Sequence, residues 1–428
     1  MSSEPPATTE AAMGATTGEG VAAPATGGET AGGGIQIRLF GRTDVGQVRE
    51  HNEDNFLVAD LTRKSRGLME ADRVQALGPR GALMAVCDGM GGAAAGEVAS
   101  QLAVDIIYER MVEGDRPGDR NEFARRLVRS IEDAGLRIYN DAKADRTRRG
   151  MGTTSTVAAL LDNYLFLGQV GDSRGYVLRA GKLVQVTRDQ SLVNQLIEAG
   201  QLTEEEAETF EHNNIILQAL GTSDSVQVDL TFVDLRRGDV LMLCSDGLSG
   251  MVRADEIREI LSTTTEPLEA CKLLTEKANQ AGGHDNITCI VARFDGPSIK
   301  PLEPGEPELK YRKYILPSEA GGQATIQEGP APVGAVAAGS SSGRGKPNSQ
   351  VHVTLVGNLG DILNNLSPEQ QKLFQQGGSP GDTSARAPVT GVDDSVDLPI
   401  NRPAGWVIVV ALLCAVAVVG VAASILLH

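Results

Sequence analysis

Short apolar runs separated by polar turns organise the middle of the chain, and amphipathic stretches interrupt them in pairs. Apolar runs of five to seven residues are typical of buried strands, and apolar positions three to four residues apart are typical of helices. The runs predict strands near 35–40, 55–60, 81–87, 153–160, 163–170, 174–179, 183–187, 228–234, 239–244 and 286–294. The helical spacing predicts helices at 96–114, 121–145, 254–263 and 266–280.

The predicted helices have recognisable apolar faces. In the first, the apolar face consists of Val98, Leu102 and Ile106, with Ile107 and Met111 on its flank. In the second it consists of Phe123, Leu127, Ile131, Leu136 and Ile138. Strands and helices do not alternate strictly, as they would around a parallel sheet. Antiparallel sheets with helices packed outside them fit this order better.

The segment 190–221 is polar and helical in pattern. Gly200 would end a first helix, and Thr203 followed by Glu206 forms a capping box for a second. Because functional loops often stand beside a rigid scaffold, a flap next to the active site is one interpretation. A plain connector is the other.

Composition divides the chain into four parts. Residues 1–34 consist mostly of Ala, Thr, Gly, Pro and Glu, which cannot bury enough surface to fold, so we expect disorder there. Residues 35–296 form the expected folded domain. Residues 297–404 return to Pro, Gly, Ser and Ala and predict a mostly disordered linker. Residues 405–428 form a separate apolar segment.

Two stretches of the linker have their own patterns. ELKYRKYILP (308–317) is interpreted either as an extra strand or as a docked linear segment. Residues 351–376 have a brief apolar pattern, with Ser367 and Pro368 placed as cap and first residue of a helix. A partner-binding segment and a solvated, fluctuating one are both compatible with it.

The C-terminal segment from Trp406 to Leu427 contains no charge and no proline. At 1.5 Å per residue it spans roughly 33 Å, enough to cross a bilayer core. A buried soluble helix is the alternative. Arg402 before the segment favours a cytoplasmic domain, so we expect a single-pass protein of the cell inner membrane. The N-terminus has no basic stretch followed by an apolar core and predicts no signal peptide.

Charge and cysteine usage exclude some functions. The net charge of −17 argues against general nucleic-acid binding, which requires a basic face. The five cysteines include no CxxC pair, so disulfides and zinc sites are poorly supported. Cysteines inside apolar runs are interpreted as small buried hydrophobic residues of a protein in a reducing compartment.

Four aspartates are each assigned a position just after an apolar run: Asp88 in LMAVCDGMGG, Asp172 in LFLGQVGDSRG, Asp246 in VLMLCSDGL and Asp285 in GGHDNIT. We interpret them as carboxylates at the ends of buried strands. Several carboxylates at one sheet edge repel each other unless cations neutralise them. Oxygen ligands suit hard ions such as Mg²⁺ or Mn²⁺, and sites of this kind often perform phosphate chemistry.

REHNED (49–54) adds an arginine and a carboxylate to this set. We expect Arg49 and Glu53 on one strand face or its terminal turn. Arg binds phosphate in a fork geometry. The glycines Gly89, Gly91 and Gly92 allow the backbone to approach a ligand closely, and a carbonyl there could bind a metal.

The ordered motifs REHNED, VCDGMGG, MGTTST, VGDSRGY, VTRDQSLVNQLIEAG, LQALG, CSDGLS and GGHDNIT resemble the bacterial form of the metal-dependent protein serine/threonine phosphatases of the protein phosphatase 2C type. The resemblance covers about residues 35–295. It implies an α+β fold: a four-layer α–β–β–α sandwich of two mainly antiparallel sheets flanked by helices. To this the chain would add one C-terminal transmembrane helix.

The resemblance implies a role for each motif residue. Asp88 would bridge two Mn²⁺ or Mg²⁺ ions, Asp246 and Asp285 would complete one site, and Glu53 with the Gly89 carbonyl would complete the other. Asp172 would hold a third, weaker ion together with Asp246. Asp54 would hold metal-bound water, and Arg49 would bind the substrate phosphate. Supporting roles fall to Ser173, Arg174, Asp189 and Asn286, and the substrate flap would present Ser191, Asn194, Glu198 and His212.

The implied reaction is direct hydrolysis of phosphoserine and phosphothreonine proteins by a metal-activated bridging water, opposing Ser/Thr kinases at the cytoplasmic membrane. We expect a monomeric catalytic domain. Some members carry a histidine, which can protonate the leaving group, where this chain has Met90. The proton donor therefore stays open, with His51 and His284 as neighbours of the motifs. Two alternatives are a non-catalytic phospho-binding scaffold and a phosphatase of small phosphoesters such as nucleotides.

Overall fold

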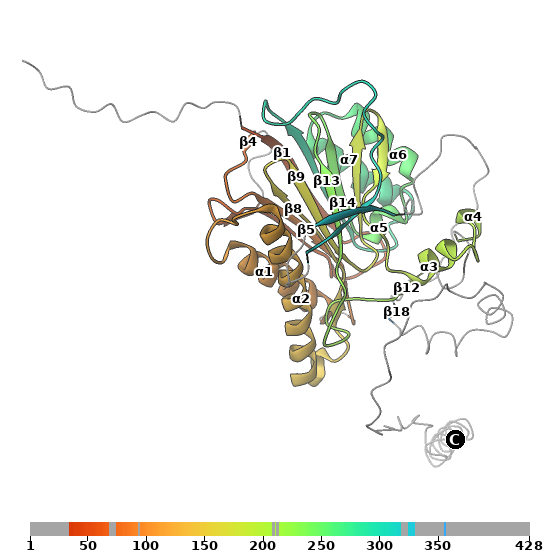
Figure 1. Cartoon of the computed structure of the whole chain (residues 1–428). Helices are drawn as coiled ribbons and strands as arrows, with labels where there is room; N and C mark the ends of the chain where they lie inside the picture. Colours follow the sequence, from red (N-terminus) through yellow and green to blue (C-terminus); the bar gives the residue numbers. More distant parts are fainter. Residues whose placement is uncertain are drawn as a thin grey trace, which may run out of the picture. The chain divides into compact units, whose positions relative to one another are not determined.

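Two antiparallel sheets organise the residues that the structure describes, which are 34–67, 74–92, 95–207, 210, 214–317, 324–329 and 355–356. The structure is a computed structural model, and all of these residues belong to one unit that extends to residue 377. Figure 1 shows the sheets lying together between two groups of helices. The expected four-layer sandwich is confirmed for this part of the chain.

The first sheet has eight strands in the order β17-β16-β13-β9-β8-β5-β2-β3. Its neighbouring strands pair antiparallel. The strands are β2 (Asn55–Asp60), β3 (Ser65–Arg66), β5 (Ala82–Cys87), β8 (Ser155–Leu161), β9 (Tyr164–Val170), β13 (Asp229–Asp234), β16 (Arg312–Ile315) and β17 (Thr325–Glu328).

The second sheet has six strands in the order β11-β10-β14-β15-β1-β4, again antiparallel. Because β1 belongs to this sheet and β2 to the other, the first two predicted strands do not form a hairpin. The strands are β1 (Gln36–Asp44), β4 (Gln75–Ala76), β10 (Arg174–Arg179), β11 (Lys182–Gln185), β14 (Val240–Cys244) and β15 (Ile287–Asp295).

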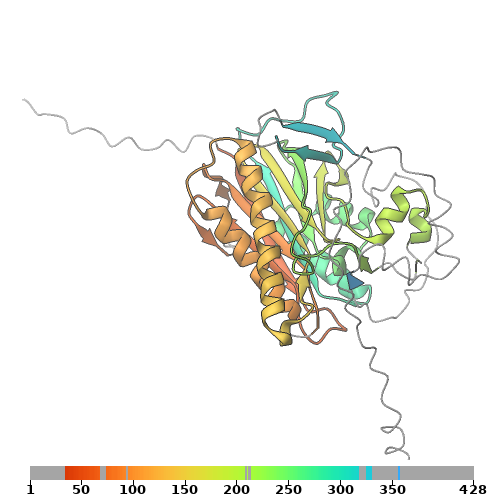
Figure 2. The same ribbon diagram turned by 60° about the horizontal axis from the view of Figure 1, so that its bottom comes forward.

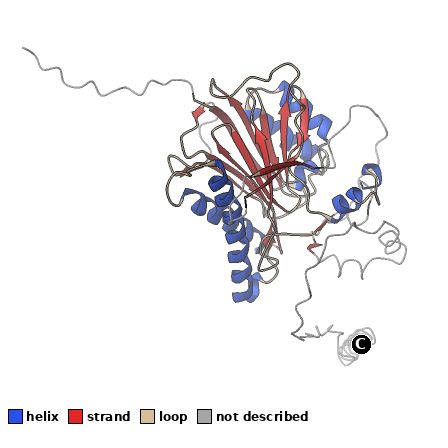
Figure 3. Cartoon of the chain, in the orientation of Figure 1, coloured by secondary structure: helices blue, strands red, loops and turns tan. Residues whose placement is uncertain are grey.

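Helices cover the outer face of each sheet, as the blue and red elements of Figure 3 show. The long helices α1 and α2 pack on the eight-stranded sheet, and Figure 2 presents them in front of it. Helices α5 to α7 pack on the six-stranded sheet. The helices are α1 (Ala95–Val112), α2 (Arg120–Ala144), α3 (Leu192–Glu198), α4 (Glu204–Ala207), α5 (Asp246–Ser249), α6 (Ala254–Thr263) and α7 (Pro267–Gln280), with a 3₁₀ turn η1 (Arg146–Arg148).

A continuous apolar layer fills the space between the sheets. Met84 and Leu167 of one sheet and Leu243 and Ile290 of the other have no exposed surface. Burial of both faces explains why these strands are apolar along most of their length rather than alternating. The shared layer makes the two sheets one rigid support for the loops at their ends.

The predicted helix faces require two corrections. In α1 the face turned to the sheet contains the fully buried Ala99, Ala103 and Ile107, whereas Val98, Leu102 and Ile106 are only partly buried. Small alanines let the helix approach the sheet closely, which the search for large apolar residues overlooked. In α2, Leu136 is 45% exposed, although it was assigned to the apolar face.

The sheet continues past the predicted domain end at residue 296. Strand β16 pairs with β13, and β17 pairs with β16, so 308–317 supplies an extra strand. The Tyr311 hydroxyl donates to Asp229 over 2.5 Å, and Tyr314 packs its ring 5.1 Å from Phe166, centroid to centroid. Part of the expected linker is therefore integral to the core.

Two short strand pairs lie outside the main sheets. β6 (Gly89–Met90) pairs antiparallel with β7 (Gly152–Thr153). β12 (Ile215–Ile216) pairs parallel with β18 (Leu355–Val356), which comes from the predicted tail.

Several predictions fall outside the described residues: the disordered N-terminus 1–33, the helix at 367–376 and the apolar segment 405–428. Within the described ranges, no helix combines the length and the apolar character needed to traverse a bilayer.

Candidate active site

The loop between β1 and β2 carries Arg49, Glu53 and Asp54. Of the two placements predicted for Arg49 and Glu53, a strand face or its terminal turn, both residues lie in the loop that precedes β2. Asn286 fixes the loop: its Oδ1 accepts from the Glu53 N–H at 2.8 Å, and its Nδ2 donates to the carbonyls of Val45 and His51. The supporting role expected for Asn286 is consistent with these bonds.

Asp88 directly follows β5, and the hydrogen bonds of its backbone set its position. Its N–H donates to Thr154 Oγ1 at 3.0 Å. Its carbonyl accepts from the Thr154 N–H and from Thr153 Oγ1, each at 2.8 Å. With every backbone group of Asp88 satisfied by the neighbouring strand, its carboxylate is held at the sheet edge.

Glu53 lies against two glycines where no side chain would fit. A Cβ at Gly89 would stand 2.5 Å from the Glu53 carbonyl oxygen, and a Cβ at Gly96 would stand 2.2 Å from Glu53 Oε2. Ser100 Oγ also donates to the Glu53 carbonyl at 2.6 Å. The Glu53 carboxylate therefore lies beside Gly96, at the start of α1, and the Glu53 carbonyl lies beside Gly89.

Asp246 and Asp285 meet across adjacent strands of the six-stranded sheet. Asp246 is the first residue of α5, just after β14. Asp285 lies before β15 rather than after an apolar run, contrary to the predicted pattern. Because β14 and β15 are antiparallel, the end of one strand meets the start of the next. A Cβ added at Gly247 would stand 3.2 Å from the Asp285 Cβ.

Asp54 is buried between the sheets and held by two hydroxyls. Its Oδ2 accepts from Ser245 Oγ at 2.8 Å and from Thr288 Oγ1 at 2.6 Å. Burial raises the pKa of Asp54 to about 7, although both hydroxyl bonds oppose the rise. Its Oδ1 has no hydrogen-bond partner.

The negative charges of these carboxylates raise one another's pKa. Burial raises the pKa of Asp88 well above its ordinary range, and the negative charges of Asp54 and Asp246 raise it further. Burial and the charge of Asp246 also raise the pKa of Asp285 and of Asp172. Buried like charges destabilise one another unless protons or cations offset them.

Arg49 brings the positive charge to this group. Its Nη2 lies 2.7 Å from Asp285 Oδ2, and both side chains remain partly exposed. The charges of Asp88 and Glu53 also help to raise the pKa of Arg49, so the guanidinium stays charged beside the carboxylates. This places a fork-shaped cation at the solvent side of the cluster.

Asp172 lies at the edge of the group, in the turn between β9 and β10. Its Oδ1 is buried without a hydrogen-bond partner. Next to it, Arg174 and Asp189 form an ion pair of 2.7 Å. Ser173 Oγ lies 2.8 Å from Thr154 Oγ1, which joins this turn to the residue that holds Asp88.

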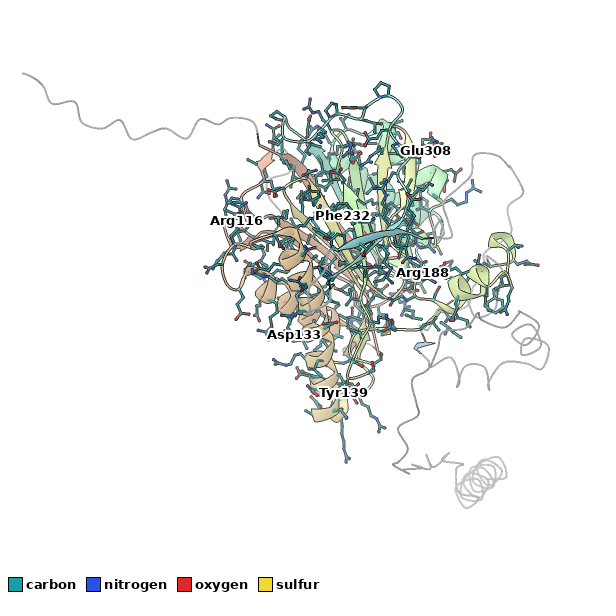
Figure 4. All side chains as sticks on the ribbon, in the orientation of Figure 1. Arg116, Asp133, Tyr139, Arg188, Phe232 and Glu308 are labelled. Atoms are coloured by element: carbon teal, nitrogen blue, oxygen red, sulfur yellow. The ribbon has the colours of Figure 1, made fainter. Side chains whose placement is uncertain are left out.

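The expected flap residues lie around α3. Ser191 caps the helix and accepts from the Asn194 N–H at 3.3 Å, and Asn194 Nδ2 donates to the carbonyl of Asp189 and to Glu198 Oε1. Glu198 pairs with Arg188, which Figure 4 labels beside α3. These bonds give Ser191, Asn194 and Glu198 a place in stabilising the helix. His212 lies outside the described residues.

The oxygen atoms of the cluster are suitable ligands for hard cations, but the side chains are not yet oriented to bind one ion together. The Oδ1 atoms of Asp54, Asp172 and Asp246 are buried without hydrogen-bond partners, which suits oxygen ligands of Mn²⁺ or Mg²⁺. Within the described ranges, no three His, Cys, Asp or Glu side chains converge closely enough to ligate one ion. Asp285 turns toward Arg49 and Asp54 toward Ser245 and Thr288, so ligation requires side chains to rotate.

Sequence reasoning missed the hydroxyl residues that hold the carboxylates. Thr154, Ser245 and Thr288 all lie inside the quoted motifs, next to or near the aspartates. Their proximity in the chain was the available signal. Ser and Thr are common in ordinary turns, so their type alone did not reveal these contacts.

Comparison with known proteins agrees with this fold and site. The model of the family described as protein phosphatase 2C matches residues 62–280, just over half of the 428 residues. The chain belongs to the protein phosphatase 2C family. It is accordingly an enzyme, a protein phosphatase.

Named relatives cover the same part of the chain. The serine/threonine phosphatase stp of Listeria monocytogenes is 36% identical over 254 residues, which are 59% of this chain and 94% of that protein. The protein phosphatase PhpP of Streptococcus pneumoniae is 37% identical over 261 residues, 61% of this chain and 98% of that protein.

A solved structure adds the cofactor. The catalytic domain of the serine/threonine protein phosphatase PstP in complex with two manganese ions has a TM-score of 0.51 and 34% identity, covering 61% of this chain and 99% of that one. The family resemblance predicted from the motifs is thereby confirmed, and two-metal chemistry with Mn²⁺ or Mg²⁺ is consistent with the oxygen donors of the cluster.

Proposed function

We propose that this chain removes phosphate from phosphoserine and phosphothreonine proteins and does so at the cytoplasmic membrane, opposing Ser/Thr kinases. The observation that carries the chemistry is the set of mutually interacting buried carboxylates beside the partly exposed guanidinium of Arg49. The relatives named serine/threonine phosphatases support the substrate class.

The proposal assigns the metal ligands as follows. Asp88 is placed at the centre of the cluster, because the negative charges of Asp54, Asp246, Asp285 and Asp172 all raise its pKa. Asp246 and Asp285 would hold one ion together with Asp88. Glu53 and the Gly89 carbonyl would hold the other with Asp88; the Glu53 carboxylate and the Gly89 carbonyl carbon both lie next to Gly96. A third, weaker ion would bind at Asp172 and Asp246.

The residues of the chain bind and orient the substrate in this proposal. Arg49 would take the phosphate oxygens in its fork, and Asp285 would position the guanidinium. Asp54 would orient a water molecule through its free Oδ1, since Ser245 and Thr288 hold the other oxygen. When bound, the ions supply activation of water near neutral pH and offset the charge on the phosphoryl group.

The proposed hydrolysis uses neither a cysteine nor a serine as nucleophile. Burial raises the pKa of Cys87 to about 12, which keeps the thiol protonated next to Asp88. Met90 is 8% exposed and packs with Ile216 and Ala219, and a thioether carries no proton to give. The leaving oxygen therefore takes its proton from another donor.

Membrane attachment through the apolar segment from Trp406 to Leu427 is the part of the proposal that rests on sequence alone. A single span would keep the phosphatase near membrane-bound kinases and raise its effective concentration there. We expect the catalytic domain to act as a monomer.

Substrate competition tests the proposed function. The full-length chain with Mn²⁺ is given a phosphothreonine peptide, a phosphoserine peptide and a nucleoside monophosphate at equal concentrations. The proposal predicts release of phosphate from both peptides at a kcat/KM at least tenfold above that for the nucleotide, where tenfold is a difference of about 1.4 kcal/mol in transition-state binding. Preference for the nucleotide would favour a small-molecule phosphatase. Peptide binding without phosphate release would indicate a scaffold.

A further inference from the structure

Strand β18, from the predicted linker, pairs with β12, which lies next to the candidate active site. β18 pairs in parallel with β12, with Leu355 opposite Ile215 and Val356 opposite Ile216. On its other side β12 is bridged to Ser191, and the Leu217 N–H donates to the Gln190 carbonyl at 2.8 Å. β12 therefore stands between the helix cap of α3 and the tail strand.

β12 packs against Met90, which belongs to the loop that carries Asp88. The side chain of Ile216 is buried against Met90 and Ala219. Met90 comes two residues after Asp88 and pairs with Gly152 in the β6–β7 ribbon. On the opposite face, Ile215 packs with Leu192 and Leu196 of α3. A strand held on the edge of β12 thus lies along the flank of the site.

The tail sequence suits strand addition. Val351, Val353 and Leu355 alternate with His352 and Thr354, a period of two with mostly β-branched residues. Strand addition to an open edge takes its affinity from main-chain hydrogen bonds, so the edge accepts extended peptides of varied sequence. A phosphorylated loop of a protein substrate is such a peptide.

We propose that the outer edge of β12 is a docking edge for extended segments of protein substrates, and that the chain's own strand at Leu355–Val356 occupies it in cis. The tail strand then competes with phosphoproteins but not with small phosphoesters, which need no strand pairing. This inference rests on the proposed function of the site.

The test compares the full-length chain with Leu355→Pro/Val356→Pro, which removes two backbone N–H groups and prevents strand pairing. If the tail strand occupies the edge about 80% of the time, its removal lowers the KM for a phosphothreonine protein about fivefold. Hydrolysis of p-nitrophenyl phosphate stays unchanged. Hydrogen exchange at the Ile216 amide becomes faster when the pairing strand is lost. Successive N–H groups of a strand point to opposite edges, and the Leu217 N–H is bonded to Gln190 on the α3 side, so its exchange should not change.

Ser395→Pro/Val396→Pro, in the same tail, is the matched control and should behave as the unmodified chain. Unchanged exchange at the Ile216 amide in Leu355→Pro/Val356→Pro would overturn the docking. Faster exchange with an unchanged KM for the phosphoprotein would overturn the competition with substrate. Absence of p-nitrophenyl phosphate hydrolysis in every chain would instead contradict the proposed function, while the exchange result still decides whether the strand docks.

Discussion

At the scale of residues, the site consists of carboxylates whose ionisation is opposed by burial and by one another. Asp88 experiences both effects, and the Arg49 guanidinium lies beside Asp285. The aspartates could be predicted from sequence because a carboxylate beside a buried strand is conspicuous. The hydroxyls of Ser245 and Thr288 could not, since the pairing that brings them to Asp54 joins residues more than 190 positions apart.

Asp246→Asn tests one carboxylate directly. Removing the charge should weaken metal binding and lower kcat/KM roughly a hundredfold or more, while the fold persists because asparagine has nearly the same size and shape as aspartate. Enzyme kinetics over a range of Mn²⁺ concentrations and circular dichroism measure both quantities. Asp255→Asn, an exposed carboxylate on α6, is the matched control. Normal activity of Asp246→Asn at ordinary Mn²⁺ levels would refute the ligand assignment.

The raised carboxyl pKa values predict an unusual pH dependence of stability. A carboxyl whose pKa is raised to about 7 in the folded state, as for Asp54, binds a proton that the unfolded chain releases near pH 4. Its contribution to the free energy of unfolding is fully present below about pH 4 and is lost as the pH rises through about 7. The metal-stripped chain should therefore lose stability in this window.

Thermal unfolding with and without Mn²⁺ isolates this effect from other titrations. Because the ions bind ionised carboxylates, the gain in Tm on adding Mn²⁺ should be larger near pH 8 than near pH 5.5. A gain that is equal at the two pH values would show that these carboxyls are not linked to metal binding.

At the scale of elements, the hydrophobic pattern predicted the four long helices and most strands of both sheets, but not β3, β4 or β17. Buried strands and amphipathic helices depend on local periodicity, which a sequence displays directly. It did not predict which sheet each strand joins: β1 and β2 are neighbours in sequence but lie in different sheets. Pairing depends on distant partners, as with β16, which joins a sheet formed mainly by residues before position 235.

Tyr314→Ala tests whether β16 belongs to the folded domain. Tyr314 is 2% exposed, packs on Phe166 and Phe232, and donates to Asn121. Its truncation should lower the free energy of unfolding by about 3 kcal/mol. Ile315→Ala, on the same strand but 42% exposed, should be nearly neutral. Equal effects in chemical denaturation would show that β16 contributes little to the core.

At the scale of the whole molecule, the sandwich follows from the ordered motifs, and the family comparison agrees with it. The prediction placed the domain end at residue 296, whereas strands continue to Glu328. Composition assigned ELKYRKYILP to the linker, although its own pattern allowed an extra strand. Its tyrosines are recognised as core only in contact with the sheet.

Membrane attachment is a prediction at this scale. The full-length chain expressed in bacterial cells should sediment with membranes and be released by detergent but not by high salt, since an apolar span of about 20 residues is held by burial rather than by charge. A chain ending at Ile400 should remain in the supernatant with its activity intact. Recovery of the full-length chain in the supernatant would refute the proposed anchor.

The most direct test of the central claim is a Mn²⁺ titration of the chelator-treated full-length chain, followed in parallel by calorimetry and by phosphate release from a phosphothreonine peptide. We predict no activity without metal, binding of two ions per chain, and activity that rises as those sites fill. Full activity in the presence of chelator, or bound ions that fail to restore hydrolysis, would contradict the account.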